Sequence, residues 1–262
     1  MHFEMTVIIP TFNEEDNIER MVVTVDAICK AHHIIEEILV VDDNSSDTTI
    51  TIVKKMMADH PFLHLIIRTQ NPGLSPSLYD GILNAEADLV QCIDCDFSHP
   101  PEKIPVFYHI LKKEGYDMVI GSRYVKGGEV INWPVLRRVL SSGAALFSRL
   151  LIPHIKDSGS GFFAINRHIL TGTVLSPRGF RMGFEILGKA HWTRVQEIPI
   201  VFKDREFGQS KLKARIICDF LIQCCSILHY NLIAKKSTNI IRAWRLFLYR
   251  PMPEKSAYQK EG

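Results

Sequence analysis

Short apolar runs alternate with amphipathic segments through the first half of this chain, and this alternation is the strongest constraint on its fold. The runs cover residues 6–10, 37–41, 64–69, 89–94 and 118–122. Helical patterns such as 77–85 and 104–114 lie between them. Strands that are apolar throughout are buried on both faces, so helices must cover both sides of the parallel sheet that they form. The sequence therefore predicts an α/β fold with a mostly parallel sheet and helices on both faces.

The second half of the chain is less regular. It predicts a helix over 135–152, strands over 161–166 and 194–202, and a long apolar stretch over 212–234. No internal repeat and no change of composition marks a second globular domain. Near the N-terminus, Asn13 is expected to cap a helix whose first turn carries three acidic residues.

Charge is distributed unevenly between the two ends of the chain. Residues 203–262 hold 12 Lys and Arg against 5 Asp and Glu, whereas the first 202 residues hold 19 against 24. A basic segment behind an acidic body favours docking on an anionic surface, either nucleic acid or a membrane. A solvated tail is the alternative.

Two stretches of the basic segment have the composition of helices at a membrane surface. Residues 216–234 are about the minimum length to span a bilayer, but they include Asp219, Gln223, His229 and Asn231. This favours an interfacial or docked helix over a span. Five apolar residues then recur at helical spacing among lysines and arginines: Ile240, Ile241, Trp244, Phe247 and Leu248. That pattern is typical of a helix in the membrane plane, and a helix packed on its own domain is the alternative.

Several familiar signals are missing from the sequence. The first ten residues lack the charged start and apolar stretch of a signal peptide, so the chain is expected to stay in the cytosol. No G-x-G-x-x-G follows the first strand, and no P-loop motif is present. Cys92 and Cys95 form an isolated C-x-x-C without a second ligand pair, so buried thiols are expected rather than a zinc site.

Asp94-Cys95-Asp96, at the end of an apolar run, is the main candidate for chemistry. Two carboxylates at a strand end can be directed at one hard cation. Mg²⁺ or Mn²⁺ takes oxygen ligands and keeps positions for substrate phosphates, so it could stabilise a departing pyrophosphate. Because D-x-D is common, a polar turn with two solvated acids is the alternative.

Other polar clusters follow neighbouring strands. Asp42 and Asp43 end one apolar run, and Glu14 follows another. In a parallel sheet these acids converge on one edge, where grouped carboxylates repel each other without a cation or hydrogen-bond donors. Five cations downstream could face a diphosphate: Arg123, Arg137, Arg138, Arg205 and Lys211. Any one of them alone would indicate a surface charge, but the set indicates phosphate binding.

Seven motifs, in order, carry a resemblance to a known family. They are PTFNEEDNI, VVDDNSSD, IDCDFSHPP, IGSRYVKGG, WPVLRR, DSGSGFFAI and DREFGQSKL. Together they closely resemble the dolichol-phosphate mannosyltransferases of glycosyltransferase family 2, from Thr6 to Lys213. The resemblance implies a GT-A-type, Rossmann-like fold with a catalytic domain over 1–211. Residues 212–262 would be an amphipathic helical segment at the membrane surface, with a tail.

The same resemblance implies inverting transfer of mannose from GDP-mannose to dolichyl or another polyprenyl phosphate, with Mg²⁺ or Mn²⁺. The enzyme would act peripherally on the cytoplasmic face of a membrane, where a separate protein could supply the anchor, and it would bind no nucleic acid. One alternative is transfer of glucose or another sugar from a UDP donor to a polyprenyl phosphate. The other is a nucleotide-sugar-binding protein without turnover.

Matching motif positions imply the roles of individual residues. The donor would contact Pro10, Phe12, Glu14, Val41, Asp43, Asp94, Cys95, Asp96, Arg123, Arg205 and Lys211. The metal would be held by Asp94, Asp96 and Ser98, and the lipid phosphate by Arg123, Arg137 and Ser141. The residues expected to be catalytic are Asp94, Asp96 and Arg123. Phe12 stands where tyrosine is usual, and Cys95 stands where alanine is usual.

A lipid phosphate is already anionic near neutral pH, so it can attack the anomeric carbon without the general base that hydroxyl acceptors need. The protein must then bring two anions together, and Arg123 between the two phosphates is the candidate for screening them. His99 is expected to be a turn histidine hydrogen-bonded to backbone rather than an acid or base. Glu185 is expected to have a structural or positioning role.

Overall fold

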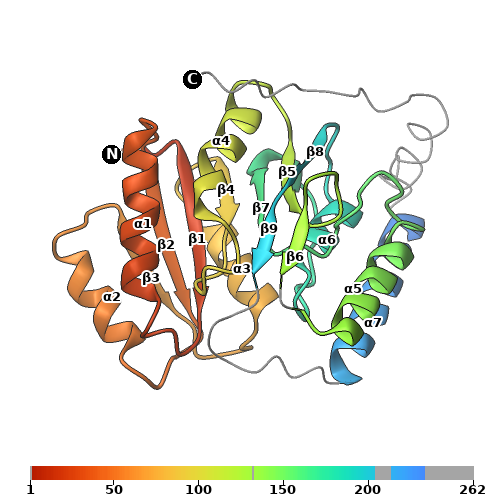
Figure 1. The fold of residues 1–262 in the computed structure, drawn as a ribbon, viewed down its shortest axis with the longest axis horizontal. Helices are drawn as coiled ribbons and strands as arrows, with labels where there is room; N and C mark the ends of the chain where they lie inside the picture. The colour runs from red at the N-terminus through yellow and green to blue at the C-terminus, as the bar shows by residue number, and fades with distance from the viewer. Residues whose placement is uncertain (1, 132, 204–213, 234–262) are drawn as a thin grey trace.

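The computed structural model describes residues 2–131, 133–203 and 214–233; for 135–140, 214–217 and 233 it describes the backbone. In these residues the main sheet has seven strands: β1 (Met5–Thr11), β2 (Glu36–Asp42), β3 (Leu63–Ile67), β4 (Leu89–Cys92), β5 (Met118–Ser122), β7 (Phe163–Asn166) and β8 (Val195–Pro199). Their order is β3-β2-β1-β4-β7-β5-β8 (Figure 1). A second sheet pairs β6 (Glu129–Ile131) with β9 (Val201–Lys203). The predicted α/β fold with a mostly parallel sheet is confirmed.

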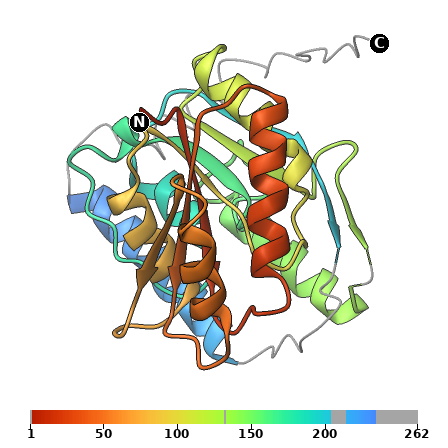
Figure 2. The ribbon, with the colours of Figure 1, turned by 90° about the vertical axis from the view of Figure 1, so that its left-hand side faces the viewer.

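Helices cover both faces of the main sheet (Figure 2). One layer contains α1 (Ile18–Ala31), α2 (Thr49–Met57) and α4 (Ile104–Lys112). The other contains α3 (Leu74–Asn84) and α6 (Met182–Lys189), with α7 (Ala214–Ile233) packed on α6 and α5 (Val135–Ser148) beside α7. Two 3₁₀ turns, Pro101–Lys103 and Arg167–Leu170, complete the regular structure in the described residues.

Alternate side chains of β1 enter two separate cores. Ile8 packs with Leu78 of α3, whereas Val7 and Ile9 pack with Met21 of α1. All five side chains are buried. Burying an apolar side chain of this size contributes about 1.5–3 kcal/mol, and a one-residue slip would exchange the two faces. The apolar run of the sequence thus fixes both the strand and its register.

The segment before β7 owes its position to the direction of that strand. β7 pairs antiparallel with both β4 and β5, and it starts opposite the end of β4, where Phe163 pairs with Cys92. The residues that precede β7 therefore lie at the edge where β4 and β5 end. The strand expected over 194–202 is also divided, because β8 ends at Pro199 and β9 begins in the other sheet.

The prediction that Asn13 caps the first helix is wrong. α1 begins at Ile18, with Asn17 at its N-cap position. Asn13 has a left-handed backbone with φ of 57°, and its side-chain oxygen accepts a hydrogen bond from Ser46 N at 2.9 Å. Asparagine tolerates this conformation, and here it joins the loops that follow β1 and β2.

Helix α7 packs on α6 through a close helix–helix contact. Phe184 and Phe220 pack with ring centroids 5.6 Å apart, and Ile227 lies so near Gly188 that an added Cβ would be 2.7 Å from it. The predicted apolar stretch over 212–234 is thus a docked helix where the structure describes it. Among the described residues, no helix is both long enough and apolar enough to cross a membrane. The pattern at 240–248 lies outside the described residues.

Glu36 gives the fold a testable pH dependence. Burial, aided by Asp26, raises the pKa of the Glu36 carboxyl from 4.5 to about 7. Between pH 4.5 and about 7, Glu36 is protonated in the folded chain but ionised in the unfolded chain. The contribution of Glu36 to the unfolding free energy is therefore present at low pH and is lost as the pH rises through about 7. From about pH 5 to 8, the unfolding free energy should fall by about 1–3 kcal/mol.

Glu36→Gln should remove this slope, because glutamine has no proton to release. Urea denaturation at both pH values measures the difference. Glu102→Gln, which replaces an exposed carboxylate, should keep the wild-type slope. An unchanged slope in Glu36→Gln would contradict the assignment.

Candidate functional site

An acidic turn follows β4 at the carboxyl edge of the sheet. Asp96 Oδ1 accepts a hydrogen bond from Ser98 N at 3.0 Å, and Phe97 between them has a left-handed backbone with φ of 57°. Such a conformation is unfavourable for a bulky residue, so surrounding contacts must hold it. Arg20 of α1 supplies one of them, with its guanidinium carbon 4.0 Å from the centre of the Phe97 ring. The turn is therefore a constrained structure.

The buried ring of His99 contacts the backbone of this turn. It stacks on Phe162 with centroids 5.1 Å apart, and its Nδ1 accepts a hydrogen bond from Asp94 N at 3.3 Å. Burial lowers the pKa of His99, against the opposing effect of Asp94, so the ring remains neutral near pH 7. His99 is thus a turn histidine bonded to backbone, as the sequence indicated.

The side chains of Cys95 and Ser98 have different surroundings. Cys95 is buried in the core layer of α1 and α4, and burial raises the pKa of its thiol well above the usual value. Any ligand contact of Cys95 would have to come from its backbone. Ser98 Oγ, by contrast, is buried without a hydrogen-bond partner among the described residues. Buried hydroxyls are normally paired, so this oxygen fits a site that has a ligand still to receive.

The carboxylates that end β2 are held by hydrogen bonds. Asp42 Oδ2 accepts from Thr11 Oγ1 at 2.7 Å, which joins the ends of β1 and β2. Asp43 pairs with Arg68, and it also accepts from Ser77 Oγ at 2.9 Å and from Gly73 N at 2.6 Å. The Asp43 side chain is therefore engaged by protein donors. Nothing in the sequence indicated a role for Arg68, which follows β3 and is buried.

The other residues expected on the nucleoside side differ in exposure. Phe12 is 59% exposed, so its ring is available for stacking on a flat ligand. Val41 is fully buried, and Pro10 is its partner in the β1–β2 ladder. The Glu14 carboxylate accepts from the Asn17 side chain at 2.9 Å. A ligand could thus contact the side chain of Phe12, whereas it could contact Val41 through the backbone.

A bidentate ion pair lies at the end of β5. Arg123 donates from Nε and Nη2 to the two carboxylate oxygens of Asp157, both at 2.7 Å, and its backbone N–H donates to Asp157 at 2.9 Å. Three aromatic rings surround the guanidinium, with centroids 5.3–5.6 Å away: Tyr124, Trp133 and Phe202. Burial disfavours the charge, but Asp157 outweighs it and raises the pKa of Arg123. The arginine is therefore permanently charged and fixed in orientation.

The segment that carries Asp157 is itself positioned by Glu197 of β8. The Glu197 carboxylate accepts from Lys156 N at 2.8 Å and from Asp157 N at 2.9 Å. Further along the same segment, Gly161 faces Asp94, so that a Cβ on this glycine would lie 3.8 Å from both carboxylate oxygens. The segment 157–161 thus joins Arg123 to the acidic turn. The sequence offered one signal for it, the DSGSG motif, but no role for Asp157.

Four predicted phosphate-binding residues cannot be located from their side chains. Arg205 and Lys211 lie outside the described residues, and of Arg137 and Arg138 the helical backbone is described. Ser141 is described, and its Oγ accepts from Tyr124 Oη at 2.9 Å. Tyr124 directly follows Arg123 in the chain. This hydrogen bond therefore links Ser141 to the residue next to Arg123.

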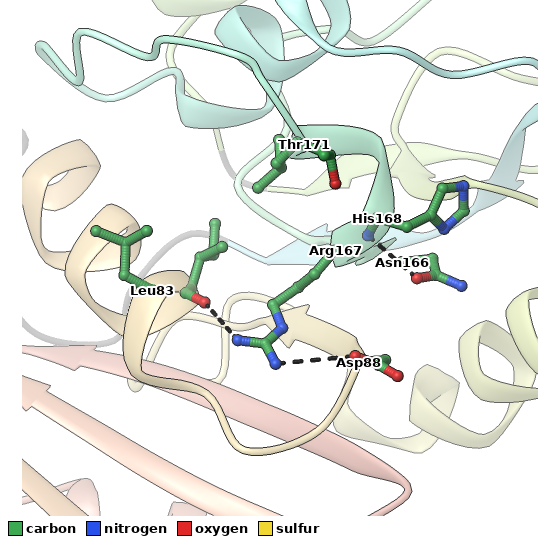
Figure 3. A pocket seen from close by; sticks show the side chains of 8 residues that line it. Leu83, Asp88, Asn166, Arg167, His168 and Thr171 are labelled. Carbon is green, nitrogen blue, oxygen red and sulfur yellow. Dashed lines mark hydrogen bonds and ion pairs between the residues drawn. The ribbon is translucent and has the colours of Figure 1, made fainter.

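Two other polar features lie at the opposite edge of the sheet. Glu37, His64 and Glu86 bring three ligand atoms within 4.8 Å, but Glu37 already accepts from Thr6 at 2.5 Å and Glu86 N at 2.8 Å. A surface hollow lies between α3 and the turn that follows β7 (Figure 3). In it Arg167 donates to the Ile82 carbonyl at 3.4 Å and lies 3.9 Å from Asp88. Both features lie away from the carboxyl ends of the parallel strands, where ligands of such sheets bind.

Glu185 of α6 lies in the core. It is fully buried and accepts from Lys189 Nζ at 2.7 Å and from Ser176 N at 2.5 Å. A buried carboxylate needs such partners, and breaking the pair would leave an uncompensated charge. These contacts fit the structural role that the sequence indicated.

Comparison with protein families adds an independent observation. The family model for glycosyl transferase family 2 matches residues 6–172. A dolichol-phosphate mannosyltransferase of Pyrococcus furiosus is 40% identical over 83% of this chain and 62% of its own length. The chain thus spans less than two thirds of that relative. A dolichol-phosphate mannosyltransferase of Saccharomyces cerevisiae is 29% identical over 95% of this chain and 96% of its own length.

A solved structure supports the fold. It is a mannosyltransferase of Pyrobaculum calidifontis in complex with GDP-mannose and Mn²⁺, similar to this chain with a TM-score of 0.58. The match covers 97% of this chain and 77% of the other, at 17% identity. At this identity the likeness establishes a shared architecture.

Replacing Asp157 should destabilise the protein. In Asp157→Asn, the side-chain amide accepts hydrogen bonds through one oxygen only, and the negative charge that balances Arg123 is lost. The unfolding free energy should therefore fall by about 2–4 kcal/mol. Urea denaturation measures this change. Asp59→Asn, which alters an exposed carboxylate, should change stability by less than about 0.5 kcal/mol. Equal stabilities of the two variants would show that the buried pair is not required.

Proposed function

This chain belongs to glycosyltransferase family 2, and from that premise we propose that it transfers mannose from GDP-mannose to a polyprenyl phosphate such as dolichyl phosphate. The observation that carries the proposal is the meeting of the Asp94–Asp96 turn with the Arg123–Asp157 pair at one sheet edge. The 40% identity to a dolichol-phosphate mannosyltransferase supports the choice of sugar and acceptor.

The donor diphosphate is proposed to lie over the acidic turn. Oxygen ligands from Asp94, Asp96 and Ser98 fit Mg²⁺ or Mn²⁺, and the hydroxyl without a described partner is the observation that favours this set. When bound, such an ion supplies charge that stabilises the departing diphosphate. Family membership and a neighbour that binds Mn²⁺ support a divalent metal.

The proposed reaction is a single displacement. An oxygen of the lipid phosphate attacks the anomeric carbon of mannose, the bond from that carbon to the GDP oxygen breaks, and GDP leaves with the electron pair. No proton has to be removed from the nucleophile, because a phosphate monoester is already ionised near neutral pH. The configuration at the anomeric carbon is therefore inverted.

Arg123 is proposed to screen the two anions during this displacement. Asp157 uses the Nε and Nη2 hydrogen bonds of the guanidinium, and Nη1 makes none with the described residues. Nη1 and the second Nη2 proton can therefore donate to phosphate oxygens. Because Asp157 holds the guanidinium in advance, little reorganisation accompanies the reaction. Arg137 and Ser141 are proposed to complete the lipid-phosphate site, and Arg205 and Lys211 the donor site.

The acceptor is a lipid, so the catalytic domain over 1–211 is proposed to dock on a membrane through the segment 212–262 together with α5. α5 and α7 lie side by side (Figure 1), and Phe147 meets Phe220 between them at 6.0 Å. Both helices expose large apolar side chains: Leu146, Phe147, Leu221, Ile222, Leu228 and Leu232. Apolar surface of this kind is favoured at the interface of a bilayer.

Transfer itself is measured with radiolabelled GDP-mannose and dolichyl phosphate, followed by extraction into organic solvent. Label should enter the organic phase, a chelator should prevent this, and UDP-glucose should not replace the donor. Asp96→Asn should lower the rate by about a hundredfold or more, because a carboxylate facing the diphosphate is lost. Asp88→Asn, at the opposite edge and 89% exposed, should leave it unchanged. Label that stays in the aqueous phase would refute the proposed function.

Docking is measured by sedimentation with vesicles that contain anionic phospholipid. Leu146→Ser and Leu232→Ser should each weaken binding about 10–150-fold, because each removes an apolar side chain whose burial in the bilayer contributes about 1.5–3 kcal/mol. Val23→Ser on α1, which is 51% exposed, is the matched control and should bind normally. If the wild-type chain does not sediment with vesicles, the docking proposal fails and a separate anchoring protein is required.

A further inference from the structure

A second arginine meets the segment 157–161 on the side of the lipid-facing helices. Arg181 immediately precedes α6, and its guanidinium lies against the backbone of Gly159. A Cβ built on that glycine would be 2.4 Å from Arg181 Nη1 and 3.2 Å from Cζ. Asp157 and Gly161 of the same segment face Arg123 and Asp94. One short segment therefore contacts both arginines and the acidic turn.

The absence of a side chain at Gly159 has a steric reason. Its φ is not among the positive values, so its backbone conformation would allow other residues. The space that a Cβ would fill is taken by Arg181. The local fold thus keeps room for this guanidinium beside the Arg123–Asp157 pair.

Arg181 differs from Arg123 in its charge balance. Among the described residues, no carboxylate lies within ion-pair distance of Arg181, whereas Arg123 has Asp157. Burial and then the charge of Arg123 lower the pKa of Arg181, and Asp157 opposes this only in part. Asp157 uses both carboxylate oxygens on Arg123, so among the described residues Arg181 has no carboxylate at ion-pair distance, although Asp219 lines the same small hollow. An anion bound between the two arginines would supply a partner for Arg181.

The surroundings of Arg181 indicate which anion this is. Its guanidinium carbon lies 4.7 Å from the centre of the Phe220 ring, and Phe220 of α7 packs against Phe147 of α5. These are the helices that expose apolar side chains. The acidic turn meets the same segment two residues further along, at Gly161. An anion at Arg181 would therefore lie next to the helices that expose apolar side chains, which fits a lipid phosphate.

We propose that Arg181 binds the phosphate of the polyprenyl-phosphate acceptor, as a further arginine beside Arg123. This inference rests on the proposed function. Arg181 holds the acceptor where its apolar chain leaves along α5 and α7, and Arg123 meets the same phosphate at the side that faces the sugar. Two guanidinium groups from different elements of the fold also fix the orientation of the attacking oxygen.

The test is steady-state kinetics of Arg181→Met, which keeps an apolar stem over Phe220 but removes the charge. The KM for dolichyl phosphate should rise about 10–100-fold, the range for losing a charged hydrogen bond, with the KM for GDP-mannose unchanged. Arg181→Lys should recover part of the loss. Lys54→Ala, which removes an exposed cation on α2, is the control for net charge and should match the wild type.

Gly159→Ala provides a second variant that retains the arginine. Its methyl group would displace the guanidinium, so the KM for dolichyl phosphate should rise in the same way while the KM for GDP-mannose stays constant. An unchanged acceptor KM in Arg181→Met, an equal rise of both KM values, or no recovery with lysine would overturn the inference. Failure of the wild-type chain to transfer mannose would instead refute the proposed function, so the two outcomes are distinct.

Discussion

The ion pair between Arg123 and Asp157 is the interaction on which the organisation of the site depends. A buried guanidinium is tolerated when a carboxylate accepts two of its hydrogen bonds, and these two residues are 34 positions apart in the chain. Their pairing joins the end of β5 to the segment before β7. Because β7 runs antiparallel between β4 and β5, the segment 157–161 that precedes it also lies against Asp94.

The chemistry proposed for this site is a problem of charge rather than of proton transfer. A lipid phosphate is already a nucleophile, so what the protein must supply is cations that let two anions approach. The described residues around Asp94 include a histidine, but burial keeps His99 neutral and its Nδ1 is occupied by backbone. The fixed guanidinium groups and the acidic turn are therefore the groups proposed to carry the reaction.

The segment 157–161 connects the groups proposed to bind the two substrates. Gly161 lies beside the acidic turn, which suits a metal and a diphosphate, and Gly159 lies against Arg181, whose guanidinium packs on Phe220 of α7. Both α7 and the neighbouring α5 expose apolar side chains. A polar donor and an apolar acceptor are thus proposed to meet at Arg123. Glycines in this segment matter because arginine and carboxylate side chains approach its backbone closely.

Much of this could be predicted from the sequence, because it depends on near neighbours in the chain. The apolar runs determined the strands, and the position of Asp94 and Asp96 after one of them determined that these acids lie at the carboxyl edge. The seven ordered motifs were sufficient to indicate the family. Tertiary structure alone decided the direction of β7, the partner of Arg123, the burial of Arg68 and the place of Arg181. Asn13 shows the same limit, since a residue suited to a helix cap instead bonds a loop 33 positions away. Periodicity and local chemistry act over a few residues, whereas the partner of a buried charge is chosen by how distant segments close around it.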